Sequence, residues 1–118
     1  MPEHHPIIAV VDDDPAVLSA LLDALNRRFG ADYRVVPHLS ARAALDDLAR
    51  RKAAGDELAL VIADQWMPEI TGSELLSRMR DVERTAQRAL LVGWGDFEAQ
   101  TAILEGCAFG KLDNYLLK

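Results

Sequence analysis

Short runs of apolar residues alternate along this chain with longer segments in which apolar residues recur at helical spacing. Residues 7–11 form a continuous apolar run, and such runs are typical of strands buried on both faces of a parallel sheet. After an acidic stretch, Pro15 fits the first turn of a helix that Asp14 caps. The apolar residues of this helix follow at Val17, Leu18, Leu21, Leu22, Leu25 and Phe29.

The same alternation continues through the middle of the chain. Residues 33–36 are a second strand candidate, and Ser40 caps an alanine-rich segment of helical spacing. Residues 58–63 form a third apolar run, which stops at Asp64. The loop that follows contains Met67, Pro68 and Gly72.

The last third of the sequence repeats this pattern twice. The expected elements are a helix marked by Leu75, Leu76 and Met79, a strand at 89–92, a helix capped by Asp96 and ended by Gly106, and a strand at 115–117. Strands that alternate with helices of this length predict an α/β fold with a doubly wound parallel sheet.

Length and composition restrict the class of protein. A chain of 118 residues predicts one domain over residues 1–118. A net charge of -6 excludes direct binding to nucleic acid, which needs clustered Lys and Arg. The N-terminus carries no signal-peptide or membrane-span pattern, and Cys107 is the only cysteine, so we expect a cytoplasmic protein without an internal disulfide or a membrane contact.

Carboxylates stand where two of the predicted strands end. Asp12 and Asp13 follow the first strand and Asp64 follows the third, and ligands of open parallel sheets bind at these carboxyl ends. Three neighbouring anions repel one another unless a hard cation such as Mg²⁺ lies among them. A carboxylate beside Mg²⁺ can attack a phosphoryl donor, while Lys118 at the end of the fifth strand balances the charge.

These residues resemble the receiver domains of two-component signalling, the CheY-like family, over nearly the whole chain. The resemblance rests on the acidic pair at 12 and 13, on Asp64, and on the Met67-Pro68 and Gly72 positions that follow it. It implies a five-stranded sheet of flavodoxin-like order 2-1-3-4-5. It also implies a phosphoacceptor switch of response regulators in signal transduction and not an enzyme with an external substrate.

The resemblance also implies roles for single residues. Asp64 matches the phosphoacceptor, Asp13 a direct Mg²⁺ ligand, and Asp12 a ligand that acts through water. The carbonyl of Trp66 matches a further metal ligand. Lys118 matches the catalytic lysine at the end of strand five.

The sequence departs from the family pattern in two ways. The switch aromatic of the family corresponds to Tyr115, but the Thr or Ser expected at the end of strand four is replaced by Gly93, or by Val92 in a shifted register. The site therefore lacks a hydroxyl donor to a phosphoryl oxygen. Family members also continue past the lysine into a fifth helix, so we expect the final helix to be missing here and an output domain to follow in the full-length protein.

Three functional hypotheses remain open. The leading one is a receiver that takes a phosphoryl group from a sensor histidine kinase or phosphotransfer protein onto Asp64 with Mg²⁺. Gly93 favours a second, a phosphorylation-impaired receiver that acts as a constitutive protein-interaction module. The third is an aspartate-nucleophile phosphohydrolase with an acid at Asp14, which the short length and the Met67-Pro68 loop disfavour.

The expected lack of a fifth helix has a consequence for assembly. Both faces of a doubly wound sheet need helices. We therefore expect the apolar face between the first helix and the fifth strand to pair with a second copy, which gives a homodimer.

Overall fold

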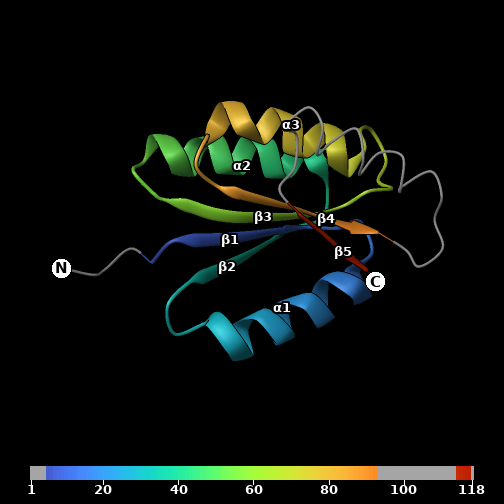
Figure 1. The fold of residues 1–118 in the computed structure, drawn as a ribbon, viewed down its shortest axis with the longest axis horizontal. Helices are drawn as coiled ribbons and strands as arrows, with labels where there is room; N and C mark the ends of the chain where they lie inside the picture. Colours follow the sequence, from blue (N-terminus) through green and yellow to red (C-terminus); the bar gives the residue numbers. More distant parts are fainter. Residues whose placement is uncertain (1–4, 93–113, 118) are drawn as a thin grey trace.

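The computed structural model describes residues 5–92 and 114–117, which form three layers (Figure 1). The parallel strands are β1 (Ile7–Val11), β2 (Arg34–His38), β3 (Leu58–Asp64), β4 (Gln87–Val92) and β5 (Asn114–Leu117). The helices among the described residues are α1 (Pro15–Phe29), α2 (Ala41–Ala53) and α3 (Gly72–Val82). The strand order is β2-β1-β3-β4-β5. The predicted α/β fold and its order 2-1-3-4-5 are therefore confirmed.

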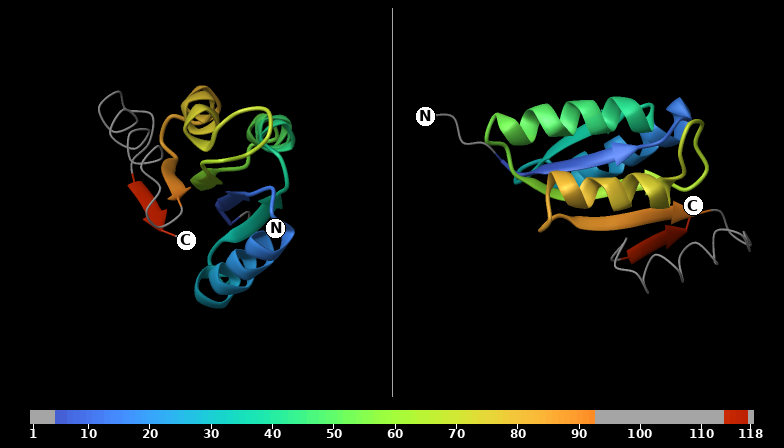
Figure 2. Two further views of the ribbon diagram at one scale, coloured as in Figure 1. Left: turned by 90° about the vertical axis from the view of Figure 1, so that its right-hand side faces the viewer. Right: turned by 90° about the horizontal axis from the view of Figure 1, so that it is seen from above.

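The helices lie on opposite faces of this sheet. Figures 1 and 2 show α2 and α3 side by side on one face and α1 on the other. Right-handed crossovers between parallel strands place successive helices in this way. None of the described helices is both long enough and apolar enough to cross a bilayer.

Most predicted elements agree with the structure, and the differences are local. The strand predicted at 33–36 lies at Arg34–His38, and β4 begins two residues earlier than predicted. Gly72 was expected in a loop, but it is the first residue of α3. The prediction was wrong because glycine usually interrupts a helix, whereas here a close approach to β3 requires it. The helix predicted between Asp96 and Gly106 lies outside the described residues.

The first turn of each described helix is capped by a short polar side chain. Asp14 Oδ1 accepts the N–H of Ala16 at 2.9 Å, and Ser40 Oγ accepts the N–H of Ala43 at 3.1 Å. Such caps satisfy N–H groups that have no partner within the helix. The predicted caps Asp14 and Ser40 are therefore confirmed.

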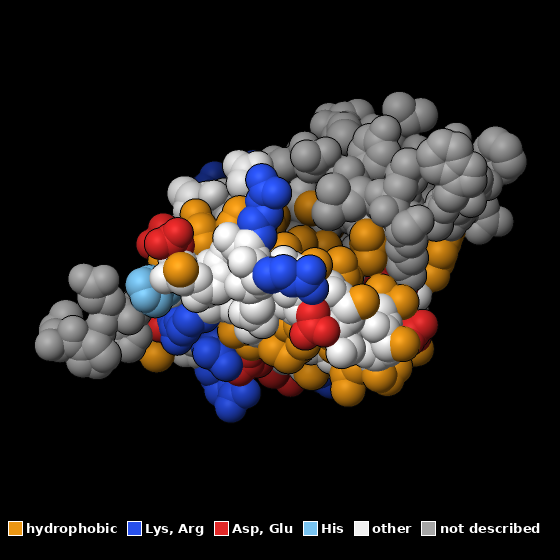
Figure 3. Space-filling view, turned by 90° about the horizontal axis from the view of Figure 1, so that it is seen from below, with side chains coloured by type: hydrophobic (Ala, Val, Ile, Leu, Met, Phe, Trp, Pro, Cys, Tyr) orange, Lys and Arg blue, Asp and Glu red, His pale blue; other side chains and the backbone are white. Residues whose placement is uncertain are grey.

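The core has one apolar layer on each side of the sheet. The layer between the sheet and helices α2 and α3 contains Val61, Leu75, Leu76, Met79 and Leu90, among others. The layer between α1 and the sheet contains Ile8, Val10, Leu18, Ile62, Ala89 and Leu91. Several apolar side chains of α1 are only partly buried, and Figure 3 shows apolar and charged side chains intermixed on this face.

An ion pair joins the ends of α2 and α3. Lys52 donates to Glu83, whose side chain is 10% exposed. The bond from Lys52 lowers the pKa of Glu83 below its ordinary value of 4.5, against the opposing effect of burial, and the hydrogen bonds from Thr85 lower it further. Because the pKa is lower in the folded state, Glu83 stabilises the fold above pH 4.5, and this contribution is lost as the pH falls through the lowered pKa.

We expect Glu83→Gln to lower the free energy of unfolding near neutral pH and to have a smaller effect at an acidic pH below 4.5, where a larger fraction of Glu83 is protonated than at neutral pH. Urea unfolding at both pH values measures the difference. Glu74→Gln is the control, because the Glu74–Arg78 pair is about half exposed on both sides and should contribute little at either pH. An equal effect of Glu83→Gln at both pH values would contradict the prediction.

Candidate functional site

Three carboxylates meet at the carboxyl ends of β1 and β3. One ligand atom from each of Asp12, Asp13 and Asp64 lies within 4.8 Å of the others. The register pairs Val11 with Ala63, so the next residue of each strand lies at the same edge of the sheet. The structure therefore brings Asp64 next to Asp12 and Asp13, from which it is about 50 positions away in sequence.

Backbone contacts fix the first of these carboxylates. The N–H of Asp12 donates to the carbonyl of His38 at 3.1 Å, which continues the pairing of β1 with β2 by one residue. Asp12 Oδ1 accepts the N–H of Asp14 at 2.9 Å. Asp12 is fully buried, whereas Asp13 is exposed at the rim. The site therefore has a buried floor and an open side.

The chemistry of this cluster suits a hard divalent cation. Asp12 and Asp64 are 0% and 4% exposed, and burying two anions this close together is costly without positive charge. All three side chains offer oxygen, and Mg²⁺ is usually held by one or two carboxylates together with water and substrate oxygens. The exposed Asp13 leaves an open side for such ligands. The donor set fits Mg²⁺.

The remaining predicted site residues are described only in part. Trp66 lies in the loop after β3, and its side chain is 45% exposed. Tyr115 lies in β5 opposite Leu90 of β4, but its side chain is outside the description. Gly93 and Lys118 also lie outside the described residues, so their predicted roles are untested.

Gln65, which directly follows Asp64, was not among the predicted site residues. It is 2% exposed, and its Oε1 accepts the N–H of Ser73 at 2.9 Å. A polar residue at the end of a buried strand usually faces solvent, so nothing in the local pattern marks it. Only its position between a predicted acceptor and a predicted helix could have drawn attention to it.

A buried histidine next to the site was also missed. His38 ends β2, and its Nε2 lies 2.8 Å from Asp47 Oδ2 on α2. Burial raises the pKa of Asp47, but hydrogen bonds from His38 and Arg51 together outweigh it and lower this pKa. These bonds connect α2 to the end of β2, where the carbonyl of His38 accepts the N–H of Asp12.

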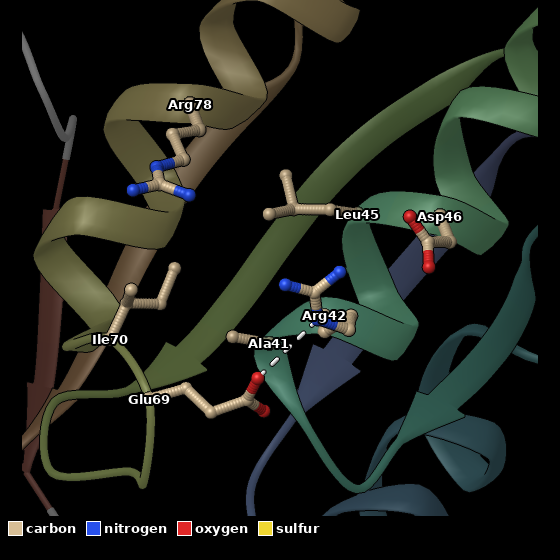
Figure 4. A pocket seen from close by; sticks show the side chains of 7 residues that line it. All are labelled: Ala41, Arg42, Leu45, Asp46, Glu69, Ile70 and Arg78. Carbon is tan, nitrogen blue, oxygen red and sulfur yellow. Dashed lines mark ion pairs between the residues drawn. The ribbon is translucent and has the colours of Figure 1, made fainter.

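A separate cavity of about 280 Å³ lies between α2, α3 and the loop after β3 (Figure 4). It is lined by Ala41, Arg42, Leu45, Asp46, Glu69, Ile70 and Arg78. Arg42 and Glu69 form an ion pair of 3.5 Å at this cavity, and their side chains are 77% and 47% exposed. None of the three clustered carboxylates lines this cavity, so it is distinct from the acidic site.

Comparison with known proteins connects this geometry to one family. The family model described as the response regulator receiver domain matches residues 8–114. The two-component response regulator ORR7 of Oryza sativa is 32% identical over 80 residues, which are 68% of this chain and 35% of that protein. The hydrogenase transcriptional regulatory protein HoxA of Cupriavidus necator is 29% identical over the whole chain, which corresponds to 22% of its own length.

A solved structure supports the same connection. The response regulator protein TrrA of Thermotoga maritima, in complex with Mg²⁺ and BeF, matches with a TM-score of 0.70 and 25% identity. The match covers 96% of this chain and 86% of that one. This chain spans about a third or less of the length of the two curated relatives.

Proposed function

This chain belongs to the response regulator receiver family, and we propose that it accepts a phosphoryl group on Asp64 in the presence of Mg²⁺. The observation that carries the proposal is the cluster of Asp12, Asp13 and Asp64 within 4.8 Å at the carboxyl ends of two adjacent strands. The Mg²⁺ and BeF complex of TrrA, a structural neighbour, supports the choice of metal.

The buried carboxylate of Asp64 acts as the nucleophile. One of its oxygens attacks the phosphorus of a phosphohistidine, an O–P bond forms, and the N–P bond breaks. The electron pair of that bond stays on the imidazole nitrogen, which takes up a proton. When bound, Mg²⁺ neutralises charge that develops on the phosphoryl oxygens.

Other residues would hold the metal and balance charge. Asp13 would bind Mg²⁺ directly and Asp12 through water, and the carbonyl of Trp66 would supply a further oxygen. Lys118 would pair with the phosphoryl oxygens. Tyr115 would respond to phosphorylation by a change of rotamer. The roles of these residues are carried over from the family pattern.

The partners follow from the family and from the lengths of the relatives. The proposed donor is a sensor histidine kinase or a phosphotransfer protein in the cytoplasm. The chain covers 22% of HoxA, a transcriptional regulatory protein. We therefore propose that an output domain accompanies this receiver in a longer protein.

Gly93 supports a second candidate, a receiver that acts through constitutive contacts without efficient phosphorylation. Glycine offers no hydroxyl to bind a phosphoryl oxygen, and a charge-assisted hydrogen bond of this kind is worth about 1.5–3 kcal/mol. Incubation with acetyl phosphate and Mg²⁺ followed by intact-mass spectrometry separates the two functions. A stoichiometric, Mg²⁺-dependent adduct supports the phosphoacceptor, and its absence supports the interaction module.

We expect Mg²⁺ to bind the acidic cluster and Asp13→Asn to weaken this binding by about tenfold or more, because one anionic ligand is lost. Isothermal titration calorimetry measures the affinity, and tryptophan fluorescence, to which Trp66 contributes, provides a second signal. Asp14→Asn is the matched control, since Asp14 caps α1 and is not among the clustered carboxylates. Equal affinities of the two variants would place the metal elsewhere.

A further inference from the structure

Gln65 directly follows the proposed acceptor Asp64, and its hydrogen bonds link the end of β3 to β4 and to the start of α3. Its N–H donates to the carbonyl of Leu91 on β4 at 3.1 Å, and its carbonyl accepts the N–H of Gly72 at 2.9 Å. Its side-chain Oε1 accepts the N–H of Ser73, also at 2.9 Å. A backbone N–H can only donate, so the atom that faces Ser73 must be the amide oxygen. The side chain is therefore held in one orientation.

These contacts provide much of the cap of α3. The first N–H groups of a helix have no partner within the helix. Gln65 accepts two of them, from Gly72 and Ser73, while Thr71 Oγ1 accepts the third, from Glu74, at 3.3 Å. One residue, adjacent to Asp64, thus fixes the start of α3.

The start of α3 in turn lies against the backbone of the acceptor. A Cβ atom at Gly72 would lie 2.2 Å from the carbonyl oxygen of Asp64. Gln65 is also the only residue between Asp64 and Trp66. Movement of its backbone would therefore displace the nucleophile on one side and a proposed metal ligand on the other.

We propose that Gln65 is a positioning residue for the phosphorylation site. By binding the N-terminus of α3, it holds the backbone from Asp64 to Trp66 in the arrangement that Mg²⁺ binding and phosphoryl transfer require. The inference rests on the proposed function. Since coupling between two sites is reciprocal, occupation of the acidic cluster also changes the environment of the Ser73 N–H.

The test replaces Gln65 with methionine, which has similar length but offers the N–H of Ser73 only a weak thioether acceptor in place of the amide oxygen. We expect the Kd for Mg²⁺ to rise about tenfold, as for other residues that orient metal ligands. The rate of labelling by acetyl phosphate should fall by a similar factor. In the wild type, Mg²⁺ should shift the amide NMR signal of Ser73, and in Gln65→Met this shift should be lost.

Two further variants separate positioning from helix capping. Thr71→Val removes the acceptor for Glu74 at the same helix end and keeps Gln65 as the acceptor for Gly72 and Ser73, and its Kd should stay within about twofold of the wild type. Gln65→Glu keeps an oxygen acceptor for Ser73 and should restore the Mg²⁺-dependent amide shift. Far-UV circular dichroism and urea unfolding of Gln65→Met itself show whether its loss of Mg²⁺ binding is a failure to fold.

The possible failures are distinguishable. An unchanged Kd and labelling rate in Gln65→Met would overturn the inference, as would an equal loss in Thr71→Val, which would make Gln65 only a helix cap. Absence of both Mg²⁺ binding and labelling in the wild type would instead overturn the proposed function.

Discussion

Asp64→Asn should abolish the adduct that acetyl phosphate forms with this protein, a loss of more than about 10³-fold in labelling rate. An amide is a far weaker nucleophile than a carboxylate, and the substitution also removes one negative charge from the cluster that would hold Mg²⁺. Asparagine has nearly the same shape, so the buried site remains filled. Intact-mass spectrometry in the presence and absence of Mg²⁺ measures the loss.

Asp14→Asn is again the control for Asp64→Asn. Asparagine caps helices as well as aspartate, so the fold is preserved, and the labelling rate should stay within about twofold of the wild type. Peptide mapping then locates the adduct in the wild type. Persistence of a stoichiometric adduct in Asp64→Asn, or its location on Asp12 or Asp13, would contradict the assignment of Asp64 as acceptor.

Gly72→Ala should lower the free energy of unfolding by about 3 kcal/mol or more, at the upper end of the cost of overpacking. The added Cβ would lie 2.2 Å from the carbonyl oxygen of Asp64, 2.8 Å from its carbonyl carbon, and 2.9 Å from Cδ1 of Leu90. Two of these atoms belong to the backbone of a central strand and cannot move aside as a side chain would. Urea denaturation measures the change.

Gly55→Ala provides the comparison for this clash. Gly55 has a φ of 95°, and no atom lies within 4 Å of an added Cβ, so its substitution costs only backbone strain of about 1–3 kcal/mol. Gly72→Ala should also disturb Asp64 and therefore Mg²⁺ binding, whereas Gly55→Ala should not. Wild-type stability and Mg²⁺ affinity in Gly72→Ala would show that α3 does not approach β3 this closely.

The amino-acid sequence by itself determined most of the elements that the structure describes and their order along the chain. The continuous apolar run at residues 7–11 coincides with β1, and Asp14 and Ser40 cap the helices that they were predicted to cap. These features depend on the periodicity of nearby residues and on local hydrogen bonds. The strand order followed from the resemblance to receiver domains, and the carboxylates were expected together because strand ends meet at one edge.

Only the tertiary structure decided which polar residues support the acidic cluster. Gln65 is buried and caps α3, and His38 is buried against Asp47, although neither residue belongs to a recognisable sequence pattern. Gly72 begins a helix because α3 passes too close to β3 for a side chain. Such contacts depend on the distance between segments that the fold packs together, and local periodicity carries no information about that distance.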